Sequence, residues 1–248
     1  MAKLAGKVAV VSGASKGIGA AIAERLAEDG AAVIVNYAAS AKQAEAVVAK
    51  IKAAGGKAEA VRADLSKPAE AKQLIDQTVA EFGRIDILVN NAGVYEFVAL
   101  ADVNEVHFDR IFDLNVKGLL FATKAAVNAF GDRGGTVINI SSMASLSAMP
   151  NSSVYSATKA AVDSFTRTLA AELGPKKILV NSVLPGPVET EGAQSLAEWD
   201  NFRGQMLPRT PLGRIGEPRD IANVVSFLAS DDSGWITGQV IPAAGGFR

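Results

Sequence analysis

Seven short apolar runs, rich in β-branched residues, alternate along the chain with six longer segments of helical periodicity. This alternation constrains the fold most, because it is typical of a parallel sheet whose two faces are both covered by helices. In the segment 17–29, for example, Ile18, Ile22 and Leu26 fall on one stripe. The predicted strands span 7–11, 31–35, 57–61, 84–89, 136–140, 178–183 and 239–241, and the predicted helices span 17–29, 40–54, 68–82, 105–127, 154–173 and 218–230.

We therefore predict one α/β domain over residues 1–248. It is a single-domain Rossmann fold, with a doubly wound seven-stranded parallel sheet and helices on both faces. The segment 185–216 departs from the regular pattern, with four prolines, five glycines and several large apolar side chains. A long turn-rich insertion of this kind is typical of a lid over a ligand, which we place at about 187–215; the alternative is an ordinary surface loop.

Composition excludes several kinds of site. The chain has no cysteine, so thiolate nucleophiles and thiolate metal sites are impossible. Its one histidine, His107, lies in an amphipathic pattern that favours a surface or packing role, and no metal site is predicted. The net charge of −1 argues against non-specific nucleic-acid binding. The apolar run near the amino end is too short for a signal peptide or a membrane span, and we expect a cytoplasmic protein.

A glycine-rich turn follows the first predicted strand, with Gly13, Gly17 and Gly19 leading into the first helix. Glycines let backbone N–H groups approach a phosphate closely, and the amino end of a helix supplies partial positive charge. No Gly-Lys-Ser/Thr sequence closes the turn, so it is not a P-loop. We interpret it as the phosphate-binding turn of a dinucleotide site; the alternative is a tight strand-to-helix turn.

The end of the second predicted strand indicates which dinucleotide binds. An acidic residue there bonds the ribose 2′-hydroxyl of NAD(H), whereas its absence beside a base suits the 2′-phosphate of NADP(H). The sequence has Asn36, Tyr37 and Ser40 at this point and no acid. Lys16 and Ser15, in the glycine turn, can reach the same corner. NADP(H) is therefore predicted in preference to NAD(H); the alternative is that Lys16 is only a solvated turn residue.

Tyr155 and Lys159 stand four residues apart in the predicted helix 154–173, so they share one face. A free phenol has a pKa near 10, and a cation held close to it favours the phenolate. Lys159 is thus expected to lower the pKa of Tyr155 and to make it a usable proton donor in reduction, or base in oxidation. Ser142 follows a predicted strand, where open α/β sheets place their sites; its alternative role is to cap a turn.

Together these motifs resemble the short-chain dehydrogenase/reductase family over essentially the whole chain. The family's glycine motif matches residues 12–19, with Ser12 in place of the usual threonine. Each match alone is weak evidence, but the complete order is specific. The other matches are Asp64 within 63–65, Asn-Asn-Ala-Gly at 90–93, Asn115, Ser142, the Tyr-x-x-x-Lys pair and Pro-Gly-x-Val-x-Thr at 185–190.

The resemblance implies a nicotinamide-dependent oxidoreductase whose catalytic residues are Asn115, Ser142, Tyr155 and Lys159. Ser142 and Tyr155 would bind the substrate oxygen, and Lys159 would also bond the nicotinamide ribose. Asn115 would hold a water that relays protons to Lys159; the alternative for Asn115 is a helix kink. Asn90 and Asn91 would line the cofactor cleft rather than merely form a turn. The predicted cofactor-binding residues are Gly13, Ser15, Lys16, Gly17, Ile18, Gly19, Asn36, Tyr37, Ala38, Ser40, Asp64, Leu65, Asn91, Ala92, Gly93, Tyr155, Lys159, Pro185, Gly186, Val188 and Thr190.

The predicted reaction is the NADPH-dependent reduction of a neutral ketone or a 3-oxoacyl group to a secondary alcohol. The chain is similar to bacterial 3-oxoacyl-[acyl-carrier-protein] reductases and related ketone reductases. No arginine lies beside the catalytic residues in sequence, although Arg203 and Arg209 of the lid could reach the substrate. An acidic carrier-protein partner would need bases near the entrance, for which Arg133, Lys176 and Lys177 are available; the alternative is that they are ordinary loop charges. By resemblance the lining comprises Val94, Tyr95, Phe97, Met143, Ala144, Ser145 and Met149, with the lid aromatics Trp199 and Phe202 above.

Three other functions compete with ketone reduction. An alcohol or sugar dehydrogenase would work in the oxidative direction. An NADP(H)-sensing module would bind cofactor without turnover, but it has no need of Tyr155 as a proton donor. An epimerase or dehydratase of the extended family would carry a larger carboxyl-terminal domain, which is not expected in a chain that ends at Arg248.

We also expect a homo-oligomer, because the family commonly forms tetramers of two-fold symmetry. The helices at 103–130 and 154–173 carry apolar or small residues on more than one face. Nothing in the pattern of a single chain covers the tail 241–248. The helical residues concerned include Val116, Leu119, Leu120, Ala160, Ala161 and Phe165.

Overall fold

All seven apolar runs form strands of one parallel sheet, with the order β3-β2-β1-β4-β5-β6-β7. The computed structural model describes residues 2–194 and 199–247. The predicted fold class is confirmed, and the largest shift in a strand boundary is at β4, which begins at Ile87. The strands are β1 (Val8–Val11), β2 (Ala32–Tyr37), β3 (Lys57–Arg62), β4 (Ile87–Asn90), β5 (Gly135–Ile140), β6 (Ile178–Pro185) and β7 (Val240–Ala243).

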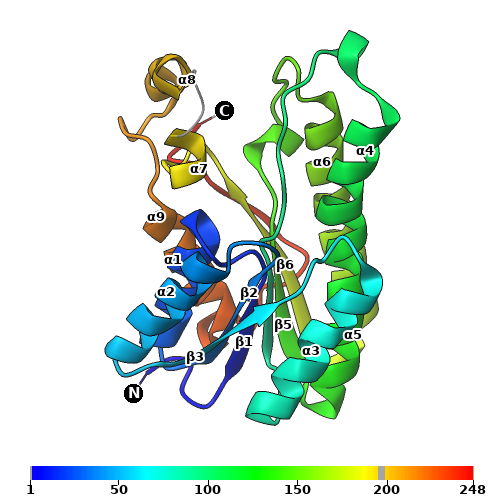
Figure 1. Ribbon diagram of the computed structural model, residues 1–248, viewed down its shortest axis with the longest axis vertical. Helices are drawn as coiled ribbons and strands as arrows, with labels where there is room; N and C mark the ends of the chain where they lie inside the picture. The colour runs from blue at the N-terminus through cyan, green and yellow to red at the C-terminus, as the bar shows by residue number, and fades with distance from the viewer. Residues whose placement is uncertain (1, 195–198, 248) are drawn as a thin grey trace.

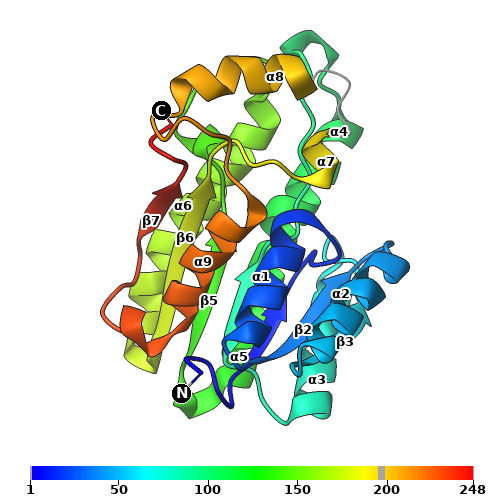
Figure 2. The same cartoon turned by 90° about the vertical axis from the view of Figure 1, so that its left-hand side faces the viewer.

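Helices cover both faces of the sheet (Figures 1 and 2). On one face, Ile22, Val47 and Ile221 of α1, α2 and α9 join a single apolar core with the strands. On the other, Leu74 and Ala122 of α3 and α5 join a second core, to which α6 also contributes. The helix bounds are α1 (Gly17–Glu28), α2 (Ala41–Ala53), α3 (Pro68–Phe82), α4 (Glu105–Phe112), α5 (Leu119–Phe130), α6 (Ser153–Leu173) and α9 (Pro218–Ala229).

A π-helical turn, Asp113–Gly118, interrupts the segment predicted as one helix over 105–127. It separates α4 from α5 and changes the register of the side chains that follow, because a π turn holds one extra residue. Gly118 lies against the backbone of Leu65, where a Cβ atom would come within 2.5 Å of the Leu65 carbonyl oxygen. The turn contains Asn115, which is 2% exposed.

The described part of the segment 187–215 includes the α-helices α7 (Glu191–Gln194) and α8 (Trp199–Met206), and α8 lies beyond the carboxyl ends of the strands (Figure 2). Trp199 and Met206 pack in one apolar cluster with Phe247 of the carboxyl-terminal tail. Phe247 is only 4% exposed, and the Leu212 N–H donates to the Gly245 carbonyl at 3.1 Å. The expectation that a single chain leaves the tail uncovered is therefore wrong for Phe247, whose side chain packs against the 187–215 segment, whereas Pro242 and Gly246 are exposed.

Within residues 2–194 and 199–247, no helix combines the length and the apolar character needed to cross a membrane. The same residues contain no group of three histidine, aspartate or glutamate side chains arranged to hold a metal ion. The cytoplasmic location stays a prediction.

Candidate functional site

The site lies where the strand order reverses, because β1 pairs with β2 on one side and with β4 on the other. In an open parallel sheet the crevice at such a point binds ligands. The Ser12 hydroxyl oxygen accepts from the N–H groups of Asn91 and Ala92, both at 2.9 Å. The Asn91 side chain donates back to the carbonyls of Ser12 and Gly13 at 2.9 and 3.1 Å. Ser12 and Asn91 thus clamp the loop after β1 to the loop after β4.

The glycine turn places bare backbone beside the amino end of α1. Gly13 and Gly17 have φ values of 60° and 57°, which favour glycine. A Cβ atom on Gly19 would lie 2.5 Å from the Asn91 side-chain nitrogen. Lys16, the N-cap residue of α1, makes no side-chain capping hydrogen bond. Uncapped helix N–H groups beside a closely packed glycine backbone fit the pyrophosphate of a dinucleotide.

The Asn36 side chain joins the glycine turn to the end of β3 through hydrogen bonds. Its side-chain oxygen accepts from the Gly13 N–H at 3.1 Å, and its nitrogen donates to the carbonyls of Val61 and Ala63 at 3.3 and 3.1 Å. The side chain is buried and its polar atoms bond the backbone. A direct contact between Asn36 and a cofactor stays a prediction.

Sequence reasoning missed Arg62 at the corner predicted for the 2′-phosphate. Arg62 lies opposite Tyr37 in the register of β2 and β3, and its Nε donates to the Ala38 carbonyl at 3.2 Å. Both Arg62 and Lys16 are exposed. The signal was present in the sequence, because Arg62 ends a strand that the order of a doubly wound sheet places beside the second strand.

Asp64 and Leu65 lie in the loop after β3, whereas Asn90 is the last residue of β4. The Asp64 carboxylate accepts from the Ser66 N–H and hydroxyl at 3.1 and 2.7 Å, and Leu65 is buried. The expectation that Asn90 lines the cofactor cleft is wrong. Its side chain is buried, and it donates to Thr123 and Asn139 at 2.9 Å because the last residue of β4 points toward α5.

Ser142, Tyr155 and Lys159 all line one cleft at the carboxyl end of β5. Lys159 Nζ donates to the Ile140 carbonyl at 2.9 Å and lies 5.7 Å from the centre of the Tyr155 ring. Ser142 hydrogen-bonds Tyr155, and its hydroxyl oxygen accepts from the Ala144 N–H at 3.1 Å. Ser142 therefore caps the short 3-10 turn Met143–Ser145 and also faces the phenol.

The pKa of Tyr155 does not move in the expected direction. Burial raises the pKa of the phenol, the hydrogen bond with Ser142 lowers it, and Tyr95 raises it further. Lys159 is itself buried, which lowers its pKa to about 8, against the opposing effect of Asp163. Its ammonium bonds the Ile140 carbonyl rather than the phenol oxygen. The expected lowering of the Tyr155 pKa is therefore wrong, because burial disfavours the charged form of both groups.

Asn115 fixes the loop that carries the aromatic wall of the cleft. Its oxygen accepts from the Val94 N–H and its nitrogen donates to the Val94 carbonyl, both at 2.9 Å. The nitrogen also donates to the Thr158 hydroxyl at 3.2 Å. A Cβ atom on Gly93 would lie 3.1 Å from the Asn115 oxygen and 3.7 Å from Lys159 Nζ. The π turn thus brings Asn115 beside Lys159; its role in a proton relay stays a prediction.

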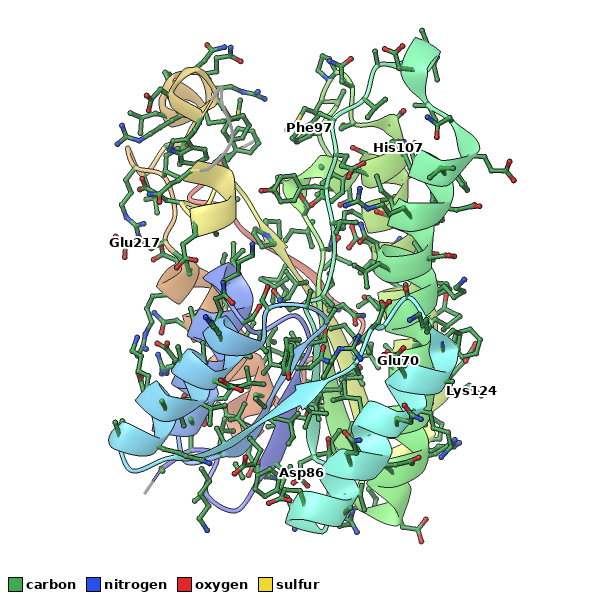
Figure 3. All side chains as sticks on the ribbon, in the orientation of Figure 1. Glu70, Asp86, Phe97, His107, Lys124 and Glu217 are labelled. Carbon is green, nitrogen blue, oxygen red and sulfur yellow. The ribbon has the colours of Figure 1, made fainter. Side chains whose placement is uncertain are left out.

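A cleft of about 460 Å³ joins the glycine turn to Ser142, Tyr155 and Lys159, whereas Asn115 does not line it. Phe97 lies on the side of this space opposite α8 (Figure 3). Of the predicted lining residues, Ser145 lies outside this space, and those that face it are Val94, Tyr95, Phe97, Met143, Ala144, Met149, Trp199 and Phe202. Met206 and Phe247 also line it, although no sequence pattern indicated that the tail folds back.

The predicted basic residues lie elsewhere. Arg203 and Arg209 are exposed and do not line the cleft, and the Arg209 guanidinium stacks 4.7 Å from the centre of the Phe247 ring. Arg133 and Lys177 lie just before β5 and β6, whereas the cleft lies at the carboxyl end of β5. Arg133, Lys176 and Lys177 therefore do not flank the entrance, in agreement with their interpretation as ordinary loop charges.

Comparison with known proteins agrees with this geometry. The family model described as enoyl-(acyl carrier protein) reductase matches residues 13–248. An uncharacterized oxidoreductase of Methylorubrum extorquens is 56% identical, with 100% of both chains covered. The structure of a short-chain dehydrogenase/reductase from Serratia marcescens is 41% identical, covers 99% of both chains and has a TM-score of 0.93. That of the angucycline C-6 ketoreductase LanV with bound NADP is 38% identical, covers 98% of this chain and 96% of LanV, and has a TM-score of 0.92. With the glycine turn and the Ser142, Tyr155 and Lys159 side chains gathered in one cleft, the chain belongs to the short-chain dehydrogenase/reductase family of nicotinamide-dependent oxidoreductases.

Proposed function

We propose that the protein reduces a neutral, largely apolar ketone to a secondary alcohol with NADPH. The observation that carries this proposal is that Ser142 and Tyr155 line one cleft together. A phenol keeps its proton at neutral pH, and burial raises the pKa of Tyr155 further. A protonated phenol beside Ser142 is a general acid, which the reduction of a carbonyl requires and the oxidation of an alcohol does not.

Each catalytic side chain then has a defined task. The hydroxyls of Ser142 and Tyr155 hold the substrate carbonyl oxygen, and the bound nicotinamide supplies a hydride. Tyr155 delivers its proton to that oxygen as negative charge develops. The ammonium of Lys159, 5.7 Å from the Tyr155 ring centre, stabilises the phenolate that remains. Asn115 keeps the Val94 loop in place beside them.

We propose NADP(H) in preference to NAD(H). The corner formed by Tyr37 and Ala38 carries no acid, and the exposed Arg62 donates to the Ala38 carbonyl. The exposed Lys16 belongs to the glycine turn, whose Ala14 N–H donates to the Asn36 carbonyl at 2.8 Å. A 2′-phosphate is favoured by such cations, whereas a 2′-hydroxyl is usually recognised by a carboxylate. The bound NADP of the similar ketoreductase LanV supports the same choice.

Replacing Tyr37 with aspartate should shift cofactor preference toward NADH by about tenfold or more, because a carboxylate accepts from a 2′-hydroxyl and repels a 2′-phosphate. The measurement is the ratio of kcat/KM for NADPH to that for NADH. Tyr37→Phe keeps the ring without a charge and should leave the ratio unchanged. An unaltered ratio in Tyr37→Asp would place the 2′-phosphate elsewhere.

The lining of the cleft supports a neutral substrate with a flat apolar body. Its residues include no arginine within the described chain. On one wall the rings of Tyr95 and Phe97 lie 6.1 Å apart, and on α8 the rings of Trp199 and Phe202 lie 5.8 Å apart. Aromatic rings at this spacing contact other rings favourably. We propose that the 187–215 segment is a lid that closes over such a ketone. A 3-oxoacyl group on a carrier protein has weaker support, since the predicted basic residues do not flank the entrance.

A panel of aryl ketones, aliphatic ketones and 3-oxoacyl thioesters, assayed with both cofactors, tests the function. We expect NADPH consumption with neutral ketones, fastest for those with an aromatic ring. Tight NADPH binding without any turnover would identify a sensing module instead. Faster oxidation of alcohols or sugars at neutral pH than reduction of the matching ketones would reverse the proposed direction.

We also propose a homotetramer. Trp235 is fully exposed beside the edge strand β7, and Val106 and Phe108 of α4 are 77% and 43% exposed. Of the predicted contact residues, Ala160 is exposed but Leu119 is buried within its own chain. Static light scattering should give four times the chain mass of 25.6 kDa. A monomer mass would contradict the assembly.

A further inference from the structure

Asp163 is a buried acid one helical turn from Lys159, and the roles of Ser142, Tyr155 and Lys159 in ketone reduction do not involve it. Lys159 and Asp163 are 6% and 3% exposed. Because residues four apart share a helix face, both side chains point from α6 toward the sheet. Lys159 Nζ donates to the Ile140 carbonyl of β5 at 2.9 Å, and the Asp163 carboxylate accepts from the Ser182 hydroxyl of β6 at 3.2 Å.

Asp163 is the only acidic side chain that is buried on α6 or on the described elements that pack against it. The strands β5 and β6 and the turn Met143–Ser145 carry no titratable side chain. In the π turn, Asp113 and Lys117 pair with each other and are 44% and 41% exposed. The other titratable or charged groups are Tyr155 of α6 itself, His107 of α4, which faces Glu96 at 3.8 Å, and a set of exposed side chains. The exposed side chains are Arg167 and Glu172 of α6, Glu105, Asp109 and Arg110 of α4, and Lys176 beyond the far end of the helix.

We propose that Asp163 is a positioning residue, a buried counter-ion that keeps Lys159 protonated while the site works. Burial alone strongly disfavours an ammonium, and a nearby carboxylate offsets that cost. In agreement, burial lowers the pKa of Lys159 and Asp163 raises it. The use of that charge to stabilise the Tyr155 phenolate rests on the proposed function; the charge coupling itself does not.

A purely structural role is the competing explanation, because the bond to Ser182 also joins α6 to β6. Two variants separate the roles. Asp163→Asn keeps an oxygen that accepts from Ser182 but removes the charge. Ser182→Ala removes the hydrogen bond but keeps the charge. A structural role predicts similar effects of both variants, whereas a counter-ion role predicts that only Asp163→Asn alters the titration of Lys159.

The test is an NMR titration of the full-length protein labelled with 13C-lysine, in which the Lys159 signal is assigned by its absence in Lys159→Met. Asp163→Asn should lower the titration midpoint of Lys159 by about one pH unit, and Ser182→Ala should leave it unchanged. Asp163→Glu, which retains the charge, should stay near the unmodified midpoint and provides a second comparison if Asp163→Asn does not fold. An unchanged midpoint in Asp163→Asn, a lowered midpoint in Asp163→Glu, or an equal shift in Ser182→Ala would overturn the proposal.

A kinetic measurement links the coupling to turnover. In the pH profile of kcat/KM for NADPH, the decrease at high pH should occur at a lower pH in Asp163→Asn. The difference in pH units should equal the shift of the NMR midpoint. The NMR result needs no turnover. A shifted midpoint in a protein that reduces no ketone would therefore refute the proposed function but not the counter-ion role of Asp163. An active enzyme with an unshifted midpoint would refute the counter-ion role but not the proposed function.

Discussion

Replacing Tyr155 with phenylalanine should lower kcat/KM for ketone reduction by about 10²- to 10⁴-fold, the range that a positioned general acid contributes. NADPH affinity should change by less than about threefold, because the ring that borders the cleft remains. The loss should fall mainly on kcat, since the proton is transferred only in the transition state. Steady-state kinetics and NADPH fluorescence titration give the two quantities.

Tyr95→Phe is the matched control for this variant. It removes a phenol hydroxyl from the same cleft, 6.2 Å away between ring centres. That hydroxyl lies beside Gly192 of α7 and is assigned no proton transfer. Its kcat should therefore stay within about threefold of the unmodified value. Near-normal turnover in Tyr155→Phe, or an equal loss in both variants, would show that Tyr155 is not the proton donor.

Lys159→Met should abolish most of the activity and yet stabilise the fold. Burial lowers the pKa of Lys159 from 10.5 to about 8, even with the opposing attraction of Asp163. A shift of this size disfavours the folded state by about 3 kcal/mol while the ammonium is charged, at 1.4 kcal/mol per pH unit. Loss of the hydrogen bond to the Ile140 carbonyl offsets about 1 kcal/mol. At pH 7 we therefore expect Lys159→Met to raise the free energy of unfolding by about 2 kcal/mol.

The stabilisation of the fold by Lys159→Met should become smaller as pH rises above 8. Below pH 8 the lysine is charged in both the folded and the unfolded chain, so the unmodified protein carries the whole cost. As pH rises from 8 to 10.5 the folded protein loses its proton first, and its stability increases relative to Lys159→Met. Urea denaturation at several pH values measures this difference. Lys124→Met, an exposed lysine on α5 (Figure 3), is the control and should change stability by less than about 0.5 kcal/mol. A destabilised Lys159→Met would mean that the buried charge is net favourable.

The strands and the catalytic helix were predictable because short-range patterns determine them. Runs such as 136–140 are apolar, short and bounded by turn residues, and Tyr155 and Lys159 belong to one continuous helix. Their spacing alone therefore brings them to one face. The glycine turn before α1 was likewise predictable, since glycines at 13, 17 and 19 follow directly from the first strand.

Features set by tertiary contacts were not predictable in this way. Periodicity does not reveal the π turn, whose Asn115 pairs with Val94, far away in sequence. The helix α8 contains Gly204 and few apolar residues, so its pattern is weak. The direction of the Tyr155 pKa depends on burial, which spacing does not report. Phe247 folds back into the cleft through packing against the lid, which the tail sequence does not indicate.

The clamp formed by Ser12 and Asn91 reduces the entropy cost of binding the dinucleotide. Four hydrogen bonds between 2.9 and 3.1 Å join the loop after β1 to the loop after β4. The conformational entropy of these loops is therefore lost when the chain folds, before any ligand arrives. Association with the cofactor does not have to order them again, so less of the interaction free energy is cancelled on binding. The recognition of the dinucleotide and the stability of the domain thus draw on the same hydrogen bonds.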